Sequence, residues 1–165
     1  ENIFDIVKEL DEAKRADRLT RYWQPYHDKL AAEIERIRAR HGKVLVWEAH
    51  SISSVLPRLF PGRLSDLNIG TNGGLSAAPE ILQAIETSLT DCPLTWVVND
   101  RFKGGYITRQ YGDPARGIHT VQLEMCYSTY MNEDHPFDYR ADLASQSKPV
   151  VQGMVTAALN ALEKC

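Results

Sequence analysis

The sequence predicts an α/β fold, in which strands and helices alternate along the chain. Short apolar runs rich in β-branched residues indicate buried strands. Longer segments with apolar residues at every third or fourth position indicate helices that pack on a sheet. The predicted strands begin with residues 43–47 and continue with 66–71, 94–99 and 118–125, and the predicted helices cover residues 13–41, 79–89 and 148–163. This alternation predicts a mostly parallel sheet with helices on both faces.

Length and composition indicate one globular domain over residues 1–165. The chain is 43% hydrophobic and 25% charged, and its net charge of -3 gives no general attraction to nucleic acid or to an anionic membrane surface. Its apolar runs are shorter than the ~20 residues that span a bilayer. The three cysteines form no CxxC pair, which argues against a disulfide framework and a thiolate zinc site. A reducing compartment is therefore expected, with the cytoplasm as the default.

The helix predicted over residues 13–41 carries one apolar stripe with mixed charges on its opposite face. Pro25 lies inside this pattern, so the helix should kink or restart there. Three aromatic residues of the stripe, Tyr22, Trp23 and Tyr26, are expected to pack in the core.

Glu48 and His50 follow the first apolar run directly. Because side chains alternate along a strand, both should project from the same face near its C-terminal end. Active sites of α/β sheets are usually built at that edge. An imidazole beside a carboxylate suits a metal ligand, although a lone histidine is more often a hydrogen-bonded structural residue. The residues alone leave both interpretations open.

The segment from residue 100 to 112 mixes cations, aromatic residues and glycines without a steady period, so no regular element is predicted there. Its arginines suit a small acidic molecule, because the guanidinium group donates two parallel hydrogen bonds to a carboxylate. The structural alternative is that one of Arg101, Arg109 and Arg116 pairs with a nearby aspartate. The sequence GTNGG at residues 70–74 matches neither common phosphate-binding glycine pattern, which excludes a nucleotide site of those types.

Glu124 lies within an apolar strand, on the face opposite to Val121 and Leu123. A carboxylate is costly to bury unless it is paired or its pKa is raised. A raised pKa is also what a general base near neutral pH requires. The residues alone fit a catalytic base and a buried ion pair equally well.

Four long motifs occur in order along the chain: EAHSI (48–52), PRLFPGRLSDLNIGTNGG (57–74), RFKGGYITRQYGDPA (101–115) and IHTVQLEMCYSTYM (118–131). Together they resemble the N-formylglutamate amidohydrolase family. The resemblance extends from the helix around Tyr22 to Leu143. Several unrelated motifs in the same order are far more specific than one short pattern.

The resemblance implies an activity, a cofactor and a set of site residues. The family hydrolyses N-formyl-L-glutamate to L-glutamate and formate, often in histidine degradation. Its fold resembles that of zinc carboxypeptidases, a three-layer α/β/α arrangement. On this basis His50 is expected to bind Zn²⁺, Glu124 to act as the general base, and Arg109 and Arg116 to hold the two carboxylates of the substrate.

The chain departs from the family pattern in two places. Ser53 stands where the family usually has an arginine. The other zinc ligands of the family lie in N-terminal motifs that do not occur in this sequence, so the chain resembles the C-terminal portion of the enzyme and is expected to be a fragment. The alternatives are a carboxypeptidase-like hydrolase of another N-acyl amino acid, and a non-catalytic fragment that lacks two zinc ligands.

Overall fold

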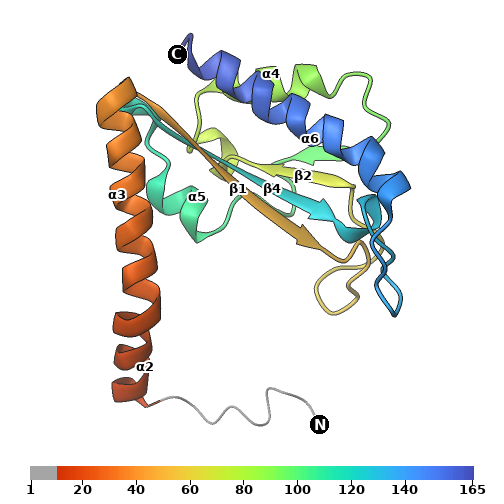
Figure 1. The fold of residues 1–165 in the computed structure, drawn as a ribbon, viewed down its shortest axis with the longest axis horizontal. Helices are drawn as coiled ribbons and strands as arrows, with labels where there is room; N and C mark the ends of the chain where they lie inside the picture. The colour runs from red at the N-terminus through yellow and green to blue at the C-terminus, as the bar shows by residue number, and fades with distance from the viewer. Residues whose placement is uncertain (1–10) are drawn as a thin grey trace.

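The computed structural model describes residues 11–165. In this part of the chain, strands and helices alternate as predicted (Figure 1). The helices are α2 (Glu12–Arg18), α3 (Gln24–His41), α4 (Pro79–Ser88), α5 (Tyr106–Tyr111) and α6 (Ala141–Leu162), and the strands are β1 (Val44–Ile52), β2 (Leu67–Gly70), β3 (Trp96–Val98) and β4 (Ile118–Cys126). None of these helices is both long enough and apolar enough to cross a membrane.

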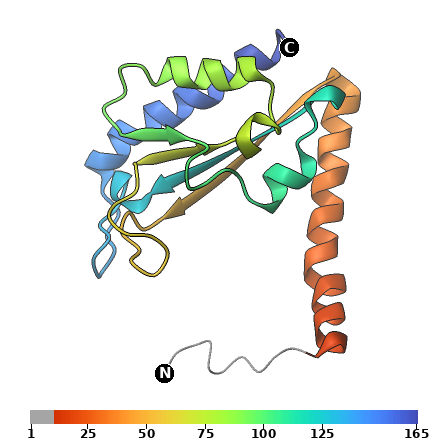
Figure 2. The same cartoon turned by 180° about the vertical axis from the view of Figure 1, so that it is seen from behind.

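The four strands form one mixed sheet in the order β1-β4-β2-β3. β1 runs parallel to β4 and β2 runs parallel to β3, whereas β2 and β4 are antiparallel. β1 and β4 are the two long strands and point in the same direction (Figures 1 and 2). Their register places His50 beside Glu124, near the C-terminal ends of both strands.

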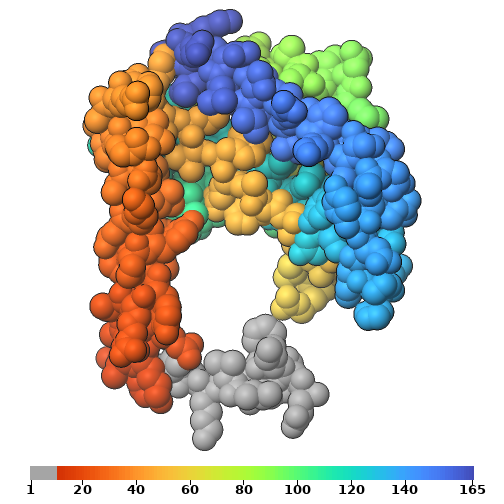
Figure 3. Space-filling model, viewed as in Figure 1, coloured from red at the N-terminus to blue at the C-terminus, as the bar shows by residue number. Residues whose placement is uncertain are grey.

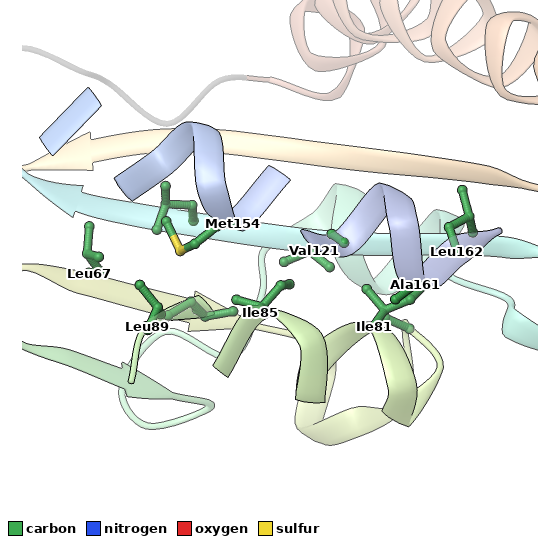
Figure 4. Packing of buried hydrophobic residues seen from close by; sticks show 12 residues of the cluster. Leu67, Ile81, Ile85, Leu89, Val121, Met154, Ala161 and Leu162 are labelled. Atoms are coloured by element: carbon green, nitrogen blue, oxygen red, sulfur yellow. The ribbon is translucent and has the colours of Figure 1, made fainter. Parts of the chain in front are cut away.

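The main hydrophobic core lies between the sheet and helices α4 and α6, which lie together on one face (Figures 1 and 4). Val121 and Leu123 of β4 point into this core, as the predicted alternation requires. Met154 of α6 and Ile85 of α4 are fully buried against them. Gln122 and Glu124 therefore belong to the opposite face of the sheet.

The opposite face is covered in separate parts. Near the start of the strands, Ile34 of α3 packs on Val44 and Ile118. Near the end of the strands, Phe60 and Leu64 of the loop after β1 pack on Cys126. Helix α5 lies against β4 on this face as well (Figure 2). Helices on both faces confirm the expected three-layer α/β/α arrangement, and His50 and Glu124 lie between the covered parts.

Two helices differ from the prediction. Helix α5 lies in the segment where no regular element was predicted. Its six residues are too few to show a helical period in the sequence. Helix α6 begins at Ala141 rather than at residue 148, and Pro149 lies inside it. The prediction rested on the apolar face that begins at Val150, and the residues before it lack that pattern. Ala144 and Ser147, which precede the proline, are nevertheless buried by the packing of this helix.

The expected restart near Pro25 takes the form of a π-helical turn, Leu19–Trp23, between α2 and α3. In this turn the N–H of Gln24 donates to the carbonyl oxygen of Leu19, five residues earlier. Pro25 lies in the first turn of α3, where the lack of a backbone N–H costs no helical hydrogen bond.

The prediction that the aromatic residues of this helix pack in the core is wrong. Tyr22 is 71% exposed and Tyr26 is 56% exposed, and Trp23 is partly exposed. The first turns of the helix stand clear of the sheet and of α6 (Figure 3), whereas the later residues Leu30, Ile34 and Ile37 do pack on the sheet. His27, which the prediction passed over, is the buried residue of this region. Its Nδ1 atom lies 2.7 Å from the hydroxyl of Tyr111 in α5.

Candidate active site

Four polar side chains share the face of the sheet that turns away from α4 and α6. Glu48 and His50 lie on β1, and Gln122 and Glu124 lie on β4. The parallel register pairs Glu48 with Gln122 and His50 with Glu124. Because adjacent strands are about 4.8 Å apart, the members of each pair are direct neighbours. The predicted shared face of Glu48 and His50 is confirmed.

A short hydrogen-bond chain holds His50 in place. Thr108 of α5 donates from Oγ1 to Glu48 Oε2 at 2.7 Å, and His50 Nε2 lies 2.9 Å from Glu48 Oε1. An ionised carboxylate can only accept, so the proton of His50 lies on Nε2 and its Nδ1 remains free to bind a ligand. Thr108 is fully buried, and Thr120 donates to its carbonyl oxygen at 2.9 Å. Through Thr108, helix α5 is thus hydrogen-bonded to both β1 and β4.

The glycine-rich segment before α5 crosses the sheet closely. A Cβ atom on Gly70 would lie 2.7 Å from the backbone nitrogen of Gly104, so this crossing requires glycine in β2. The N–H of Gly105 donates to Gln122 Oε1 at 2.5 Å. Arg109 donates from Nη1 to the carbonyl oxygen of Gly104 at 2.6 Å and is itself exposed. Arg109 therefore lies on the segment that covers Gln122 and Glu48.

Glu124 is the buried acid of this face, with only 8% of its surface exposed. Burial raises the pKa of its carboxyl group, the positive charge of a protonated His50 would lower that pKa, and the negative charge of Glu48 raises it. Within residues 11–165 its backbone oxygen accepts from Asn68, but its carboxyl oxygens have no hydrogen-bond partner. A buried carboxyl group with a raised pKa and free oxygens has the properties of a general base.

Arg116 lies at the opposite end of the sheet. Its Nη2 atom is 2.9 Å from Glu35 Oε1 of α3, which is an ion pair rather than one of the aspartate pairs considered from the sequence. The neighbouring Gly117 accepts a hydrogen bond from the N–H of Val44, at the start of β1. Arg116 precedes the start of β4, and the six residue steps of strand from Ile118 to Glu124 correspond to roughly 20 Å. The structure therefore brings His50 and Glu124 together and Arg109 to the adjacent segment, and it keeps Arg116 away from them.

The side chains around His50 determine whether a zinc ion can bind there. Residues 11–165 contain no group of three or more His, Cys, Asp and Glu side chains that could hold a metal ion. His50 offers one nitrogen, while Glu48 already accepts from Thr108 and His50. Because a zinc site needs at least three protein ligands, these residues do not complete one by themselves.

Sequence reasoning missed the role of Thr108. Its position gave no signal, because the short helix that carries it has no recognisable period. Gln122 was placed on the correct face by strand alternation, but nothing in the sequence indicated that the N–H of Gly105 fixes its side chain. Both contacts depend on how the segment before α5 folds back over the sheet.

Comparison with known proteins identifies the family. The model of the N-formylglutamate amidohydrolase family matches residues 1–131. N-formylglutamate deformylases of Pseudomonas putida and Pseudomonas aeruginosa are 46% and 45% identical over 142 residues, which is 86% of this chain and 53% of each relative. The chain thus spans about half the length of the curated relatives that it matches.

Solved structures agree with this assignment. The crystal structure of an N-formylglutamate amidohydrolase from Ralstonia eutropha superposes with a TM-score of 0.79 at 25% identity, over 96% of this chain and 57% of that one. A gene product of Agrobacterium tumefaciens shares the fold, with a TM-score of 0.63 at 20% identity over 94% of this chain and 55% of its own. Motifs, fold and sequence relatives thus agree: the chain belongs to the N-formylglutamate amidohydrolase family.

Proposed function

We propose that this chain carries the proton-transfer half of an amidohydrolase site that hydrolyses N-formyl-L-glutamate to L-glutamate and formate. The observation that supports this most directly is Glu124, a buried acid with a raised pKa and free carboxyl oxygens beside His50. The names of the two Pseudomonas relatives supply the substrate. As the family resemblance implies, the reaction would serve histidine degradation, and the cysteine pattern makes the cytoplasm the expected compartment.

In this proposal Glu124 moves the proton of the reaction. Its carboxylate accepts a proton from the water whose oxygen attacks the formyl carbon. The C–N bond then breaks, and Glu124 returns the proton to the departing nitrogen of glutamate. The released amine and formate account for all atoms of water and substrate. Burial assists Glu124, because a raised pKa makes the same group an adequate base and then an adequate acid near neutral pH.

We further propose that the reaction uses Zn²⁺ and that His50 supplies one ligand through Nδ1. The contact between Nε2 and Glu48 supports this, because ligating histidines commonly donate their other N–H to a carboxylate. When bound, zinc would polarise the formyl carbonyl and lower the pKa of its water. Residues 11–165 contain no group of three such ligands, so a complete site would need ligands from outside them.

Arg109 is the proposed partner of a substrate carboxylate. It is exposed on the segment that covers Gln122, and its guanidinium group has donors beyond the one bound to Gly104. Arg116 was predicted for the same task, but its ion pair with Glu35 and its distance from Glu124 do not support a contact with the same substrate.

A hybrid protein tests the proposed function. In it, the residues of this chain replace the matched 142-residue stretch of the Pseudomonas putida deformylase. Formate release from N-formyl-L-glutamate is expected, and Glu124→Gln should reduce the rate by about 10²–10⁴-fold, the usual contribution of a general base. Glu86→Gln, at a partly exposed position on α4, is the matched control. A folded hybrid without formate release, or equal rates for the Glu124 variant and its parent, would refute the proposal.

Zinc content tests the metal separately. We expect about one zinc per hybrid molecule, and less than one in ten in His50→Ala at the same free zinc concentration. Full zinc content in the variant would exclude His50 as a ligand while leaving the assignment of Glu124 open to its own test.

A further inference from the structure

The side chain of Gln122 has a fixed orientation. The backbone N–H of Gly105 can only donate, and it does so to Gln122 Oε1 at 2.5 Å. The oxygen of this amide therefore faces Gly105, and the NH2 group must lie on the other side of the side chain. Gln122 is only 5% exposed, so the orientation is also held by packing.

The NH2 group of Gln122 has two donors and no acceptor. No hydrogen bond from Nε2 is formed to any residue in 11–165. Trp47 Nε1 is the one fully enclosed side-chain nitrogen or oxygen in this part of the chain without a partner. Because Gln122 Nε2 is not such an enclosed atom, it reaches the surface of the open face. A polar group that is nearly buried and has free donors usually awaits a partner.

The position of Gln122 connects these donors to the candidate site. It precedes Glu124 by two residues on β4, so the two side chains project from the same face about 7 Å apart. On β1 its neighbour is Glu48, the carboxylate that orients His50. A molecule that rests against His50 and Glu124 therefore lies within reach of the Gln122 amide.

We propose that Gln122 is a substrate-binding residue whose NH2 group donates a hydrogen bond to the acyl carbonyl oxygen of an N-acyl amino acid. The inference rests on the proposed function and adds a residue to it. An NH2 group can recognise only an acceptor oxygen, either a carbonyl or a carboxylate. The carboxyl groups of Glu48 and Glu124 flank this position, and like charges repel, so an uncharged carbonyl oxygen fits there better than a carboxylate.

Two variants of the 165-residue chain separate the donors from the rest of the side chain. Gln122→Glu keeps an acceptor for the N–H of Gly105 and replaces the NH2 group. Gln122→Met is neutral and removes both groups, which controls for the charge that the first variant adds. Gln83→Glu, at an exposed position on α4, is the matched control for net charge. Binding of N-formyl-L-glutamate and of L-glutamate, which lacks the acyl carbonyl, is measured by calorimetric titration.

Both Gln122 variants should weaken the binding of N-formyl-L-glutamate by about tenfold, the usual effect of losing one hydrogen bond of this kind. Binding of L-glutamate should change by less than about threefold in Gln122→Met. Unchanged binding of N-formyl-L-glutamate in both variants would overturn the inference. An equal loss for the two ligands in Gln122→Met would overturn the carbonyl assignment and point to a carboxylate contact.

A spectroscopic measurement on the unmodified chain keeps the test independent of variant folding. The side-chain NH2 resonances of Gln122 should shift when N-formyl-L-glutamate binds and stay within error for L-glutamate. Binding without any shift of these resonances would overturn the inference and leave the proposed function standing. A chain that binds neither ligand and a hybrid that releases no formate would instead refute the proposed function itself.

Discussion

Replacing Thr108 with valine tests the chain of contacts that holds His50. Valine has nearly the same shape but removes the hydroxyl that donates to Glu48 Oε2 at 2.7 Å. The Glu48 side chain is only 11% exposed, so water can replace that donor only in part. Hydrogen bonds to charged groups contribute about 1.5–3 kcal/mol, and the free energy of unfolding should fall by about that amount. For a chain of this size this corresponds to a decrease in Tm of roughly 3–12 °C.

Thr108→Ser is the matched control, because it keeps the hydroxyl and loses one buried methyl group, at a cost of about 1 kcal/mol. Urea unfolding followed by circular dichroism gives the free energy of unfolding for all three proteins. The serine variant should be the more stable of the two. If the valine variant were as stable as the parent, or more stable than the serine variant, then the bond to Glu48 would not stabilise α5 as inferred.

Three further predictions concern packing and titration. Gly112→Ala should lower the free energy of unfolding by about 1–3 kcal/mol, because the new Cβ would lie 2.5 Å from the side chain of Ser76. Gly153→Ala, where nothing lies within 4 Å of the new Cβ, should raise it by about 0.5–1 kcal/mol. Urea unfolding measures both changes. Ile85→Ala in the core should lower the free energy of unfolding by about 2–5 kcal/mol in the same assay, and Leu159→Ala, at a position that is 47% exposed, should lower it by well under half of that. Burial lowers the pKa of His119, so the unfolded chain binds its proton more readily than the folded chain does. The free energy of unfolding should therefore fall as the pH drops below about 6.5, and His119→Asn should flatten that decline; a slope that the substitution leaves unchanged would exclude this histidine as its source.

Strand alternation explains why much of the candidate site was predictable. A period of two predicts that Glu48 shares a face with His50, and that Gln122 shares a face with Glu124. The pairing of these two strands was not predictable in the same way, since adjacency and register depend on contacts between segments about 75 residues apart. Likewise, the ion pair between Arg116 and Glu35 joins distant segments and left no local signal.

The apolar stripe predicted over residues 13–41 shows a second limit of prediction from sequence. Periodicity identified the apolar face of the helix correctly, but it could not say which part of that face is covered. Only the last turns pack on the sheet, around Ile34, and Tyr22 and Tyr26 remain exposed in the described structure. Apolar spacing predicts a surface that can be buried, and the neighbouring elements decide whether it is.

The most direct test of the account measures catalysis and stability together in Glu124→Gln of the hybrid protein. The raised pKa means that burial disfavours the ionised carboxylate in the folded state. At neutral pH the uncharged glutamine should therefore keep or raise the free energy of unfolding while formate release falls by about 10²–10⁴-fold. Loss of rate with unchanged or higher stability is the predicted result. A rate that persists, or one that falls only together with stability, would contradict the assignment of Glu124 as the base.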